Sequence, residues 1–245
     1  SKKILSKKKI KVRKILVNNF QDFYQSYYAI KKDIIPFIDA KIAISKDFFT
    51  IKKGSKWITN YLSRNRVHLL RSQYDCILST SKSINKDNSL LNCRLNGFKN
   101  DKPDLAIIDL KFKIKKKLDL FKLKGKRKIL IITSNLKIKK ISYFKKKGVK
   151  IVFIKSLQNK SELISLFKIF KKYGYNRILL ESGLNFLNTL IKNKLIFNLY
   201  VFQSSKKLRK FGLNNSTANF IKKMNLTRKI KANLDGDNLY KVKIK

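Results

Sequence analysis

Short apolar runs recur along the chain from residue 36 onward, and stretches with a helical spacing of apolar residues separate several of them. The runs are rich in Ile, Leu and Phe and end at polar turn residues, which is typical of buried β-strands. The predicted strands cover residues 36–44, 74–79, 104–109, 128–133, 150–154, 177–181 and 197–202. The predicted helices cover residues 60–73, 139–148, 161–173 and 184–193.

The alternation of strands and helices sets the predicted fold class. Helical crossovers between strands favour an α/β domain with a mostly parallel central sheet flanked by helices. Residues 226–233 and 239–244 surround an Asp-Gly turn at 235–236 and predict a C-terminal antiparallel hairpin. Residues 36–245 are therefore predicted to form one domain. Residues 1–35 are a basic, aromatic extension, expected to hold a short strand and a helix.

Composition excludes several classes of protein. The 245 residues are 43% hydrophobic, which is enough for a buried core and argues against disorder. No apolar run approaches the roughly 18 residues needed to cross a bilayer, so no membrane partner is expected. Cys76 and Cys93 lack the spacing of metal ligands, and with one His no metal site is predicted. A reduced cytoplasmic compartment is the expected location.

The charge balance is extreme, with 60 Lys and Arg against 14 Asp and Glu, or a formal charge of +46. Such a balance usually indicates nucleic acid or another polyanion as partner. Here Lys is spread along the whole chain beside abundant Asn and Ile, while Gly and Pro are scarce. A genome rich in A/T codons produces this pattern, so nucleic-acid binding is not expected. The charge still favours small anionic ligands.

A strand–turn–helix segment is the first candidate for chemistry. The apolar strand 177–181 ends at Glu181, turns through Ser182 and Gly183, and leads into a helix. Backbone N–H groups at such a helix start bind phosphate, and Gly permits close approach. An ordinary connection gives the same pattern. Glu181 favours function, because only two Glu occur in the chain and α/β ligands bind at the carboxyl ends of strands.

Two further segments hold candidate residues. In the first, Thr59 is the predicted N-cap of the helix from residue 60, and Trp57 packs in the core or covers a ring. Arg71, near the end of that helix, suits either the helix dipole or an anion. His68 is interpreted as a structural residue. The second segment, 81–95, is a predicted polar loop after a strand that carries Asp87 and Arg94.

Taken together, these segments match one known pattern in order and spacing. The chain reads PFIDAKIAIS from residue 36, then SKWIT, LLRSQYDCIL, DNSLLNCR and LESGLNF. They resemble the reductase domain of the bifunctional riboflavin-biosynthesis pyrimidine deaminase/reductase, with its motifs S-x-W-I-T, L-R-[AS]-Q, D-D-P-x-L-T-x-R and V-E-G-G-x-x-L. The resemblance covers residues 36–202 and implies a dihydrofolate-reductase-like fold. It also implies that residues 1–35 are the remnant of, or linker from, a preceding deaminase domain.

The resemblance assigns roles to individual residues. It implies NADPH-dependent reduction of 5-amino-6-(5-phosphoribosylamino)uracil to 5-amino-6-(5-phosphoribitylamino)uracil, and a homodimer is expected. The residues implied for the phosphorylated pyrimidine substrate are Ser55, Arg71, Leu91, Arg94 and Glu181. The residues implied for NADPH are Ala43, Trp57, Ser83, Asp87, Gly183, Leu184, Asn185, Phe186 and Leu187. The proton donor stays open between Lys41, Glu181 and water.

The family's D-D-P reads DNS in this chain, and three further positions depart from the family pattern. Phe48 stands where Gly is usual, Leu110 replaces a Ser after the third strand, and Ser182 replaces the first Gly of E-G-G. Two alternatives to the implied function remain: a reductase of the undeaminated diaminopyrimidine, and a basic nucleic-acid-binding module that has lost activity.

Overall fold

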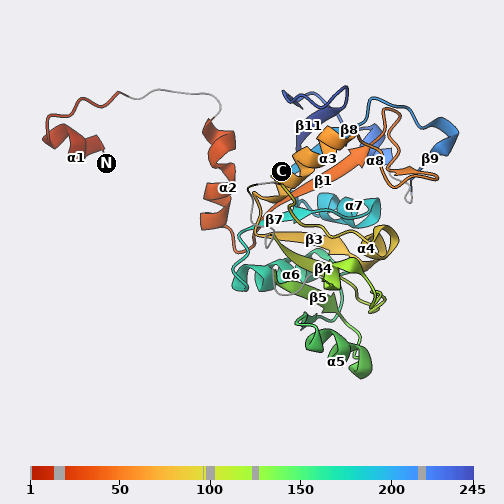
Figure 1. Ribbon diagram of the computed structural model, residues 1–245. Coiled ribbons are helices and arrows are strands. Elements are labelled where there is room, and N and C mark those ends of the chain that lie inside the picture. The colour runs from red at the N-terminus through yellow and green to blue at the C-terminus, as the bar shows by residue number, and fades with distance from the viewer. Residues whose placement is uncertain (1, 14–19, 96, 98–102, 123–126, 215–218) are drawn as a thin grey trace.

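The computed structural model describes residues 2–13, 20–95, 97, 103–122, 127–214 and 219–245, and Figure 1 shows how the elements are arranged. The helices are α1 (Lys2–Lys7), α2 (Phe20–Lys32), α3 (Tyr61–Arg71), α4 (Ser81–Asp87), α5 (Ile138–Lys146), α6 (Lys160–Lys172), α7 (Leu184–Lys192) and α8 (Asn219–Lys222). The strands are β1 (Phe37–Ile44), β2 (Ile51–Lys52), β3 (Cys76–Thr80), β4 (Asp104–Ile108), β5 (Ile129–Thr133), β6 (Lys150–Phe153), β7 (Arg177–Leu180), β8 (Asn198–Gln203), β9 (Gly212–Leu213), β10 (Lys229–Ile230) and β11 (Asn238–Lys243).

A single large sheet organises the described residues. Its strand order is β10-β11-β8-β1-β7-β3-β4-β5-β6. From β8 to β6 every neighbouring pair is parallel, whereas β11 pairs antiparallel with both β8 and β10. The strands β2 and β9 form a separate antiparallel pair. The predicted α/β class, mostly parallel sheet and C-terminal antiparallel hairpin are confirmed.

Helices cover both faces of the sheet. Successive strand side chains point to opposite faces, so Cys76 and Leu78 join one core cluster while Ile77 joins another. On the first face, α6 and α7 contribute the buried residues Leu163, Leu166, Phe167, Phe170, Leu184, Leu187 and Leu190. On the opposite face, α3, α4 and α5 contribute Val67, Leu70, Ile84 and Phe144. The parallel strands are therefore buried on both sides, which explains their continuous apolar runs.

Two local predictions are corrected. The N-cap of α3 is Asn60 rather than Thr59, because the Asn60 side chain accepts the Ser63 N–H at 2.9 Å. The Asn60 amide also donates to the carbonyls of Leu234 and Asp235, contacts that are remote in sequence. The predicted loop 81–95 begins with a helix, α4, because the Thr80 hydroxyl caps its first turn through the Ser83 N–H.

The N-terminal extension also differs from expectation. Residues 2–13 contain the helix α1 and no strand, and residues 14–19 lie outside the described part of the chain. Lys and Leu in the first residues favour helix over strand locally. The expected helix is present as α2, where the Ile30 carbonyl accepts a hydrogen bond from Lys171 Nζ of α6 at 3.1 Å.

Within the described residues, no helix is long and apolar enough to cross a membrane. The same part of the chain contains no group of three His, Cys, Asp or Glu side chains that could hold a metal ion. Cys76 and Cys93 are both buried free thiols.

Candidate active site

Main-chain pairing at the carboxyl end of β7 brings several candidate residues together. In the register of β1 and β7, Ala40 pairs with Leu180, so Lys41 and Glu181 follow at the same level. Glu181 lies directly beyond β7, and its backbone N–H donates to the Leu78 carbonyl of β3 at 2.9 Å. The centre of the site is therefore set by main-chain pairing. In Figure 1 it lies at the edge where α4 and α7 begin.

Arg71 and Glu181 form a forked ion pair. Arg71 Nε lies 2.6 Å from Glu181 Oε1, and Arg71 Nη2 lies 3.0 Å from Oε2. The Arg71 and Glu181 side chains are 11% and 8% exposed. Two parallel charge-assisted hydrogen bonds fix both groups far better than a surface pair would. Two of the five predicted substrate residues are thus in direct contact.

Lys41 completes a triad of charges with this pair. Its Nζ lies 3.8 Å from Glu181 Oε2. Burial by itself raises the pKa of the Glu181 carboxyl, but the charge and hydrogen bonds of Arg71, with Lys41, hold that pKa below its ordinary value. Burial lowers the pKa of the Lys41 ammonium, and the Glu181 charge partly opposes this. Glu181 is therefore held as an anion, so of the two groups Lys41 is the one with a proton to donate.

The helix that carries Arg71 is anchored at its start by the C-terminal hairpin. The Asp237 carboxylate accepts the Asn60 N–H at 2.9 Å and the Ser63 hydroxyl at 2.7 Å through Oδ2. Its Oδ1 accepts the Ser205 N–H at 3.1 Å. A carboxylate at a helix N-terminus satisfies orphan donors and suits the helix dipole. Asp237 thereby fixes the axis along which α3 presents Arg71.

Arg94 reaches the same region through a buried contact network. Its Nη1 donates to Asn92 Oδ1 at 2.7 Å, and its Nη2 lies 3.3 Å from His68 Nε2. The Asn92 carbonyl accepts Arg71 Nη1 at 3.1 Å and lies 2.9 Å from His68 Nδ1. Asn92 and His68 are buried, whereas Arg94 is exposed. The two predicted substrate arginines are thus linked through Asn92, whose main-chain carbonyl accepts from Arg71 and whose side-chain oxygen accepts from Arg94.

Arg127 binds the main chain of the loop that carries Leu91. Its guanidinium donates to the carbonyls of Leu90 and Leu91 and contacts the Pro103 carbonyl at 3.4 Å. Burial lowers the pKa of Arg127 to about 10. Leu91 has a positive φ of 49° and a buried side chain. Its predicted substrate contact can therefore come only from its main chain.

The first turn of α7 forms the predicted cofactor phosphate site. Gly183 is its N-cap and provides no side-chain cap, so no side chain occupies the following N–H groups. The Gly183 N–H donates to Ser83 Oγ at 3.1 Å, which ties α7 to α4. A Cβ at Gly183 would meet only Ser83 Oγ, at 3.7 Å. Free amides at a helix start are the donor set that a dinucleotide phosphate requires, so these residues fit a nicotinamide dinucleotide.

The other residues of this turn divide by burial. Leu184 and Leu187 point into the core and can offer a ligand only backbone groups. Asn185 is exposed and Phe186 is half-buried against the core.

The remaining predicted cofactor residues are Ala43, Trp57 and Asp87. Ala43 follows Lys41 by two positions on β1 and so shares its face of the sheet. Trp57 is 52% exposed, and the Arg64 guanidinium lies 4.8 Å from its ring centroid. Ser55 Oγ donates to the Trp57 carbonyl at 3.2 Å and accepts the Trp57 N–H at 3.3 Å. Burial raises the pKa of Asp87, with Lys86, Lys56 and Lys41 opposing.

The three departures from the family pattern have local structural consequences. Phe48 has φ 66°, a left-handed conformation that Gly adopts without strain. The Leu110 carbonyl accepts hydrogen bonds from the Ser134 and Thr133 hydroxyls at 3.0 and 3.2 Å. These contacts use the main chain of residue 110, so they do not depend on whether its side chain is Ser or Leu. Ser182 Oγ donates to the Gly183 carbonyl at 3.3 Å and keeps the turn compact.

Four residues take part in the contacts of the site but are not among the predicted substrate or cofactor residues. They are Lys41, Asn92, Arg127 and His68, and the sequence favoured a structural role for His68. One sequence signal was available for Lys41, because a Lys inside a buried apolar strand is unusual. The other three act through contacts that no short pattern encodes.

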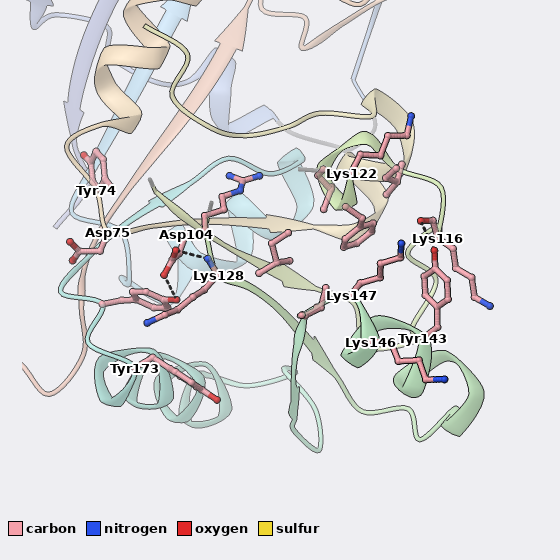
Figure 2. A pocket seen from close by; sticks show the side chains of 18 of the residues that line it. Tyr74, Asp75, Asp104, Lys116, Lys122, Lys128, Tyr143, Lys146, Lys147 and Tyr173 are labelled. Carbon is pink, nitrogen blue, oxygen red and sulfur yellow. Dashed lines mark hydrogen bonds between the residues drawn. The ribbon is translucent and has the colours of Figure 1, made fainter. Parts of the chain in front are cut away.

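A separate hollow lies at the opposite edge of the sheet (Figure 2). Its lining includes Tyr74, Asp104, Lys128 and Tyr173 near the amino ends of the strands, and none of the predicted site residues. Asp104 Oδ2 accepts the Tyr175 hydroxyl at 2.8 Å, and Oδ1 accepts the Lys128 N–H at 2.8 Å. The amino groups of the labelled lysines point in different directions (Figure 2). This hollow does not present a converging set of ligand groups.

Comparison with known proteins identifies the family. The model of the RibD C-terminal domain matches residues 36–208. The chain belongs to this family. The RibD C-terminal domain match spans every predicted site residue and confirms the resemblance found in the motifs.

Two named relatives come from Buchnera aphidicola. Riboflavin biosynthesis protein RibD of subspecies Baizongia pistaciae is 30% identical over 190 residues, covering 71% of this chain and 49% of that protein. The 5-amino-6-(5-phosphoribosylamino)uracil reductase of subspecies Acyrthosiphon pisum is 30% identical over 165 residues, covering 63% of this chain and 77% of that protein. The chain thus spans about half the length of the RibD relative.

Solved structures of RibD family proteins share the fold. Acinetobacter baumannii RibD aligns with a TM-score of 0.74 and 17% identity, covering 99% of this chain and 68% of that one. The riboflavin biosynthesis reductase Rib7 of Saccharomyces cerevisiae aligns with a TM-score of 0.67 and 21% identity, covering 93% and 100%. At these identities the likeness establishes the fold.

Proposed function

We propose that the chain catalyses the NADPH-dependent reduction of 5-amino-6-(5-phosphoribosylamino)uracil to 5-amino-6-(5-phosphoribitylamino)uracil. The observation that carries the proposal is the buried Arg71–Glu181 pair at the carboxyl end of β7, with Lys41 of β1 beside it. This is where parallel α/β sheets bind ligands. The Buchnera reductase of that name, 30% identical over 77% of its length, supports the same activity.

The cofactor would bind along α7 and the loop before α3. The free N–H groups of the first turn of α7 would hold its phosphates, and the exposed Trp57 ring would cover a cofactor ring. When bound, NADPH supplies a hydride to C1′ of the open-chain imine form of the substrate. The chain itself binds and orients both molecules, which is the main demand of this chemistry.

The substrate phosphate would bind Arg94. Asn92 contacts Nη1 and His68 contacts Nη2 of its guanidinium, and the N–H groups that these two contacts do not use are left for a forked contact to a dianion. Leu91 would add main-chain contacts from the same loop, and Ser55 a hydroxyl from the loop before α3. Arg71 is already bound by Glu181 and the Asn92 carbonyl, so its charge acts on the substrate from a fixed position.

Lys41 is the proposed proton donor. The imine nitrogen must gain a proton when C1′ is reduced. Glu181 is held ionised by Arg71, so it has no proton to give. Lys41 carries protons on Nζ, and its pKa is lowered by burial, which makes release easier. Glu181 then keeps Lys41 in place during the transfer.

The test has two stages. A fluorescence titration with NADPH should show saturable binding, and a flat titration would contradict the reductase assignment. Turnover is then followed by NADPH absorbance with the uracil substrate and with its undeaminated diaminopyrimidine analogue. Faster turnover of the uracil compound supports the proposal, whereas preference for the diaminopyrimidine moves the enzyme to the other substrate. Lys41→Gln should abolish turnover while leaving NADPH binding intact.

The assembly and location belong to the same proposal. We expect a homodimer in the cytoplasm, with residues 1–35 as an extension of a reductase domain that spans 36–245. Sedimentation of the purified chain measures the assembly. Removing residues 1–32 and repeating the NADPH titration tests the boundary, because the titration should be unchanged if the domain begins at residue 36.

A further inference from the structure

His68 is buried next to the residue assigned to the substrate phosphate. Its ring lies on α3 three residues before Arg71, and its Nε2 lies 3.3 Å from Arg94 Nη2. Its Nδ1 lies 2.9 Å from the Asn92 carbonyl and 3.2 Å from the Arg94 backbone N. One imidazole therefore contacts both the backbone and the guanidinium of the loop that ends at Arg94.

The surroundings of His68 select one tautomer. With the proton on Nδ1, the ring donates to the Asn92 carbonyl, and the Nε2 lone pair accepts from Arg94 Nη2. With the proton on Nε2, the ring would place N–H against N–H at Arg94 and a lone pair against the Asn92 carbonyl. The first tautomer satisfies the contacts with the Asn92 carbonyl and with Arg94 Nη2, and it leaves only the Arg94 backbone N–H without an acceptor at Nδ1. The second tautomer satisfies that backbone N–H alone, so the network supports the first.

The charges around the ring require it to be neutral. Burial, followed by the charges of Arg71 and Arg94, lowers the pKa of His68 to about 4. A neutral ring with a lone pair toward Arg94 is an acceptor that attracts the guanidinium. Asn92 Oδ1 supplies the second acceptor, at 2.7 Å from Arg94 Nη1. Two acceptors on different elements, α3 and the loop after α4, define the guanidinium plane.

We propose that His68 is a positioning residue that holds the Arg94 guanidinium in the orientation that binds the substrate phosphate. The inference rests on the proposed function through the assignment of Arg94. It adds a residue from α3, so the same helix supplies Arg71 and orients Arg94. A shift of α3 would therefore change both cationic contacts together.

Three substitutions separate the roles of the two ring nitrogens. In His68→Gln the side-chain oxygen can stand near Nε2 and still accept from Arg94. In His68→Asn the shorter amide can stand near Nδ1 and contact Asn92, but no acceptor reaches Arg94. His68→Leu keeps the volume and loses both contacts. Tyr175→Phe is a matched control, because it removes a hydrogen bond to Asp104 at the opposite edge of the sheet.

The readout is affinity for ribose 5-phosphate, measured by calorimetry, together with KM and kcat for the phosphorylated pyrimidine. His68→Leu and His68→Asn should weaken ribose 5-phosphate binding about 10-fold, because a misaligned guanidinium loses part of a charge-assisted contact. The KM should rise by a similar factor, while kcat and the NADPH Kd stay within about twofold. His68→Gln should recover most of the loss, and Tyr175→Phe should change none of these values.

A dephosphorylated substrate gives the decisive comparison. The effect of His68→Leu should vanish with it, because Arg94 then has no phosphate to bind. On an Arg94→Ala background, His68→Leu should add nothing. If Arg94→Ala weakens ribose 5-phosphate binding and His68→Leu does not, the positioning role of His68 is overturned while the phosphate role of Arg94 stands. If neither variant changes it, the assignment of Arg94 fails and the inference falls with it.

Discussion

The proposed substrate half and the proposed cofactor half of the site are built differently. On the substrate side, Arg71 binds Glu181, and both Arg71 and Arg94 bind oxygens of the buried Asn92. On the cofactor side, Trp57 is half-exposed and the first turn of α7 has no side-chain cap. One half is thus preorganised, and the other offers open donors and an exposed ring. The difference indicates that orientation of the substrate is built into the fold.

Burial explains why the substrate half is so tightly paired. A carboxylate as buried as Glu181 is costly unless cations and hydrogen bonds surround it. Arg71 and Lys41 supply the charges, and Ser79 Oγ fixes the Glu181 carbonyl at 2.6 Å. The cofactor half contains mainly backbone N–H donors. Water can accept their hydrogen bonds until a ligand takes its place. Substitutions should therefore have larger effects on the substrate side.

The largest effect is expected at the buried ion pair. Glu181→Gln leaves Arg71 and Lys41 without their counterion, so kcat/KM should fall about 100-fold or more through misplacement of the substrate. The free energy of unfolding should fall by about 3 kcal/mol, as for other broken buried pairs. Steady-state kinetics and urea unfolding measure both. Glu162→Gln, at the only other Glu of the chain, is the control and should leave kcat/KM unchanged.

The next effect is expected at Arg94. Arg94→Ala removes a forked charge-assisted contact worth about 1.5–3 kcal/mol, which corresponds to substrate binding about 10- to 150-fold weaker. Arg94→Lys should recover only part of this loss, since a point charge cannot reproduce the fork. The NADPH Kd should not change, and Arg66→Ala, an exposed Arg on α3, should affect neither ligand. Equal losses of affinity for substrate and for NADPH would contradict the division of the site into a substrate half and a cofactor half.

A smaller effect is expected on the cofactor side, where NADPH binding should weaken and substrate binding should not change. Gly183→Val adds bulk beside the free amides of α7 and should raise the NADPH Kd about 10-fold, equivalent to one lost phosphate contact. The fold should tolerate it, because a Cβ there meets only Ser83 Oγ, at 3.7 Å. Gly183→Ala should have a weaker effect, and ribose 5-phosphate binding should stay constant. An unchanged NADPH Kd in a folded Val variant would exclude this turn from the cofactor site.

The smallest effect is expected in the pH dependence of folding stability. The pKa of Glu181 is lower in the folded chain than its ordinary value, so its ion pair stabilises the fold above the unfolded pKa of about 4.3. That stabilisation should be lost as pH falls through the folded pKa. The stability difference between wild type and Glu181→Gln should therefore shrink from pH 5 to pH 3. Urea unfolding at several pH values measures it, and a constant difference would show that Glu181 is not ionised.

The sequence predicted the main strands because burial on both faces produces unbroken apolar runs, as in 128–133 and 177–181. It also placed Glu181 and Gly183 correctly at a strand end and a helix start. It could not predict the N-cap at Asn60, whose partners Leu234 and Asp235 are far along the chain. It did not predict α4, because Ser, Lys and Asn are common in loops. The residue that caps this helix, Thr80, also lies just before the segment 81–95.

The contacts within the site were beyond sequence reasoning for the same reason. The bond between His68 and Arg94 joins a helix to a loop, and only the packing of α3 against the sheet creates it. The motifs selected Arg71, Arg94 and Glu181 individually. The pairing of Arg71 with Glu181, and the contacts of both arginines with Asn92, depend on how α3 and the loop after α4 pack against the sheet.

The contact of Asp237 with α3 also has a consequence for how the protein is made. Ser63 and Asp237 are 174 residues apart, so at about 5–20 residues per second the ribosome needs roughly 9–35 s to pass from one to the other. During that interval the helix that carries His68 and Arg71 lacks its carboxylate partner. The parallel strands can pair earlier, but this helix reaches its final axis only when the hairpin has emerged. The binding site is therefore among the last parts of the nascent chain to mature.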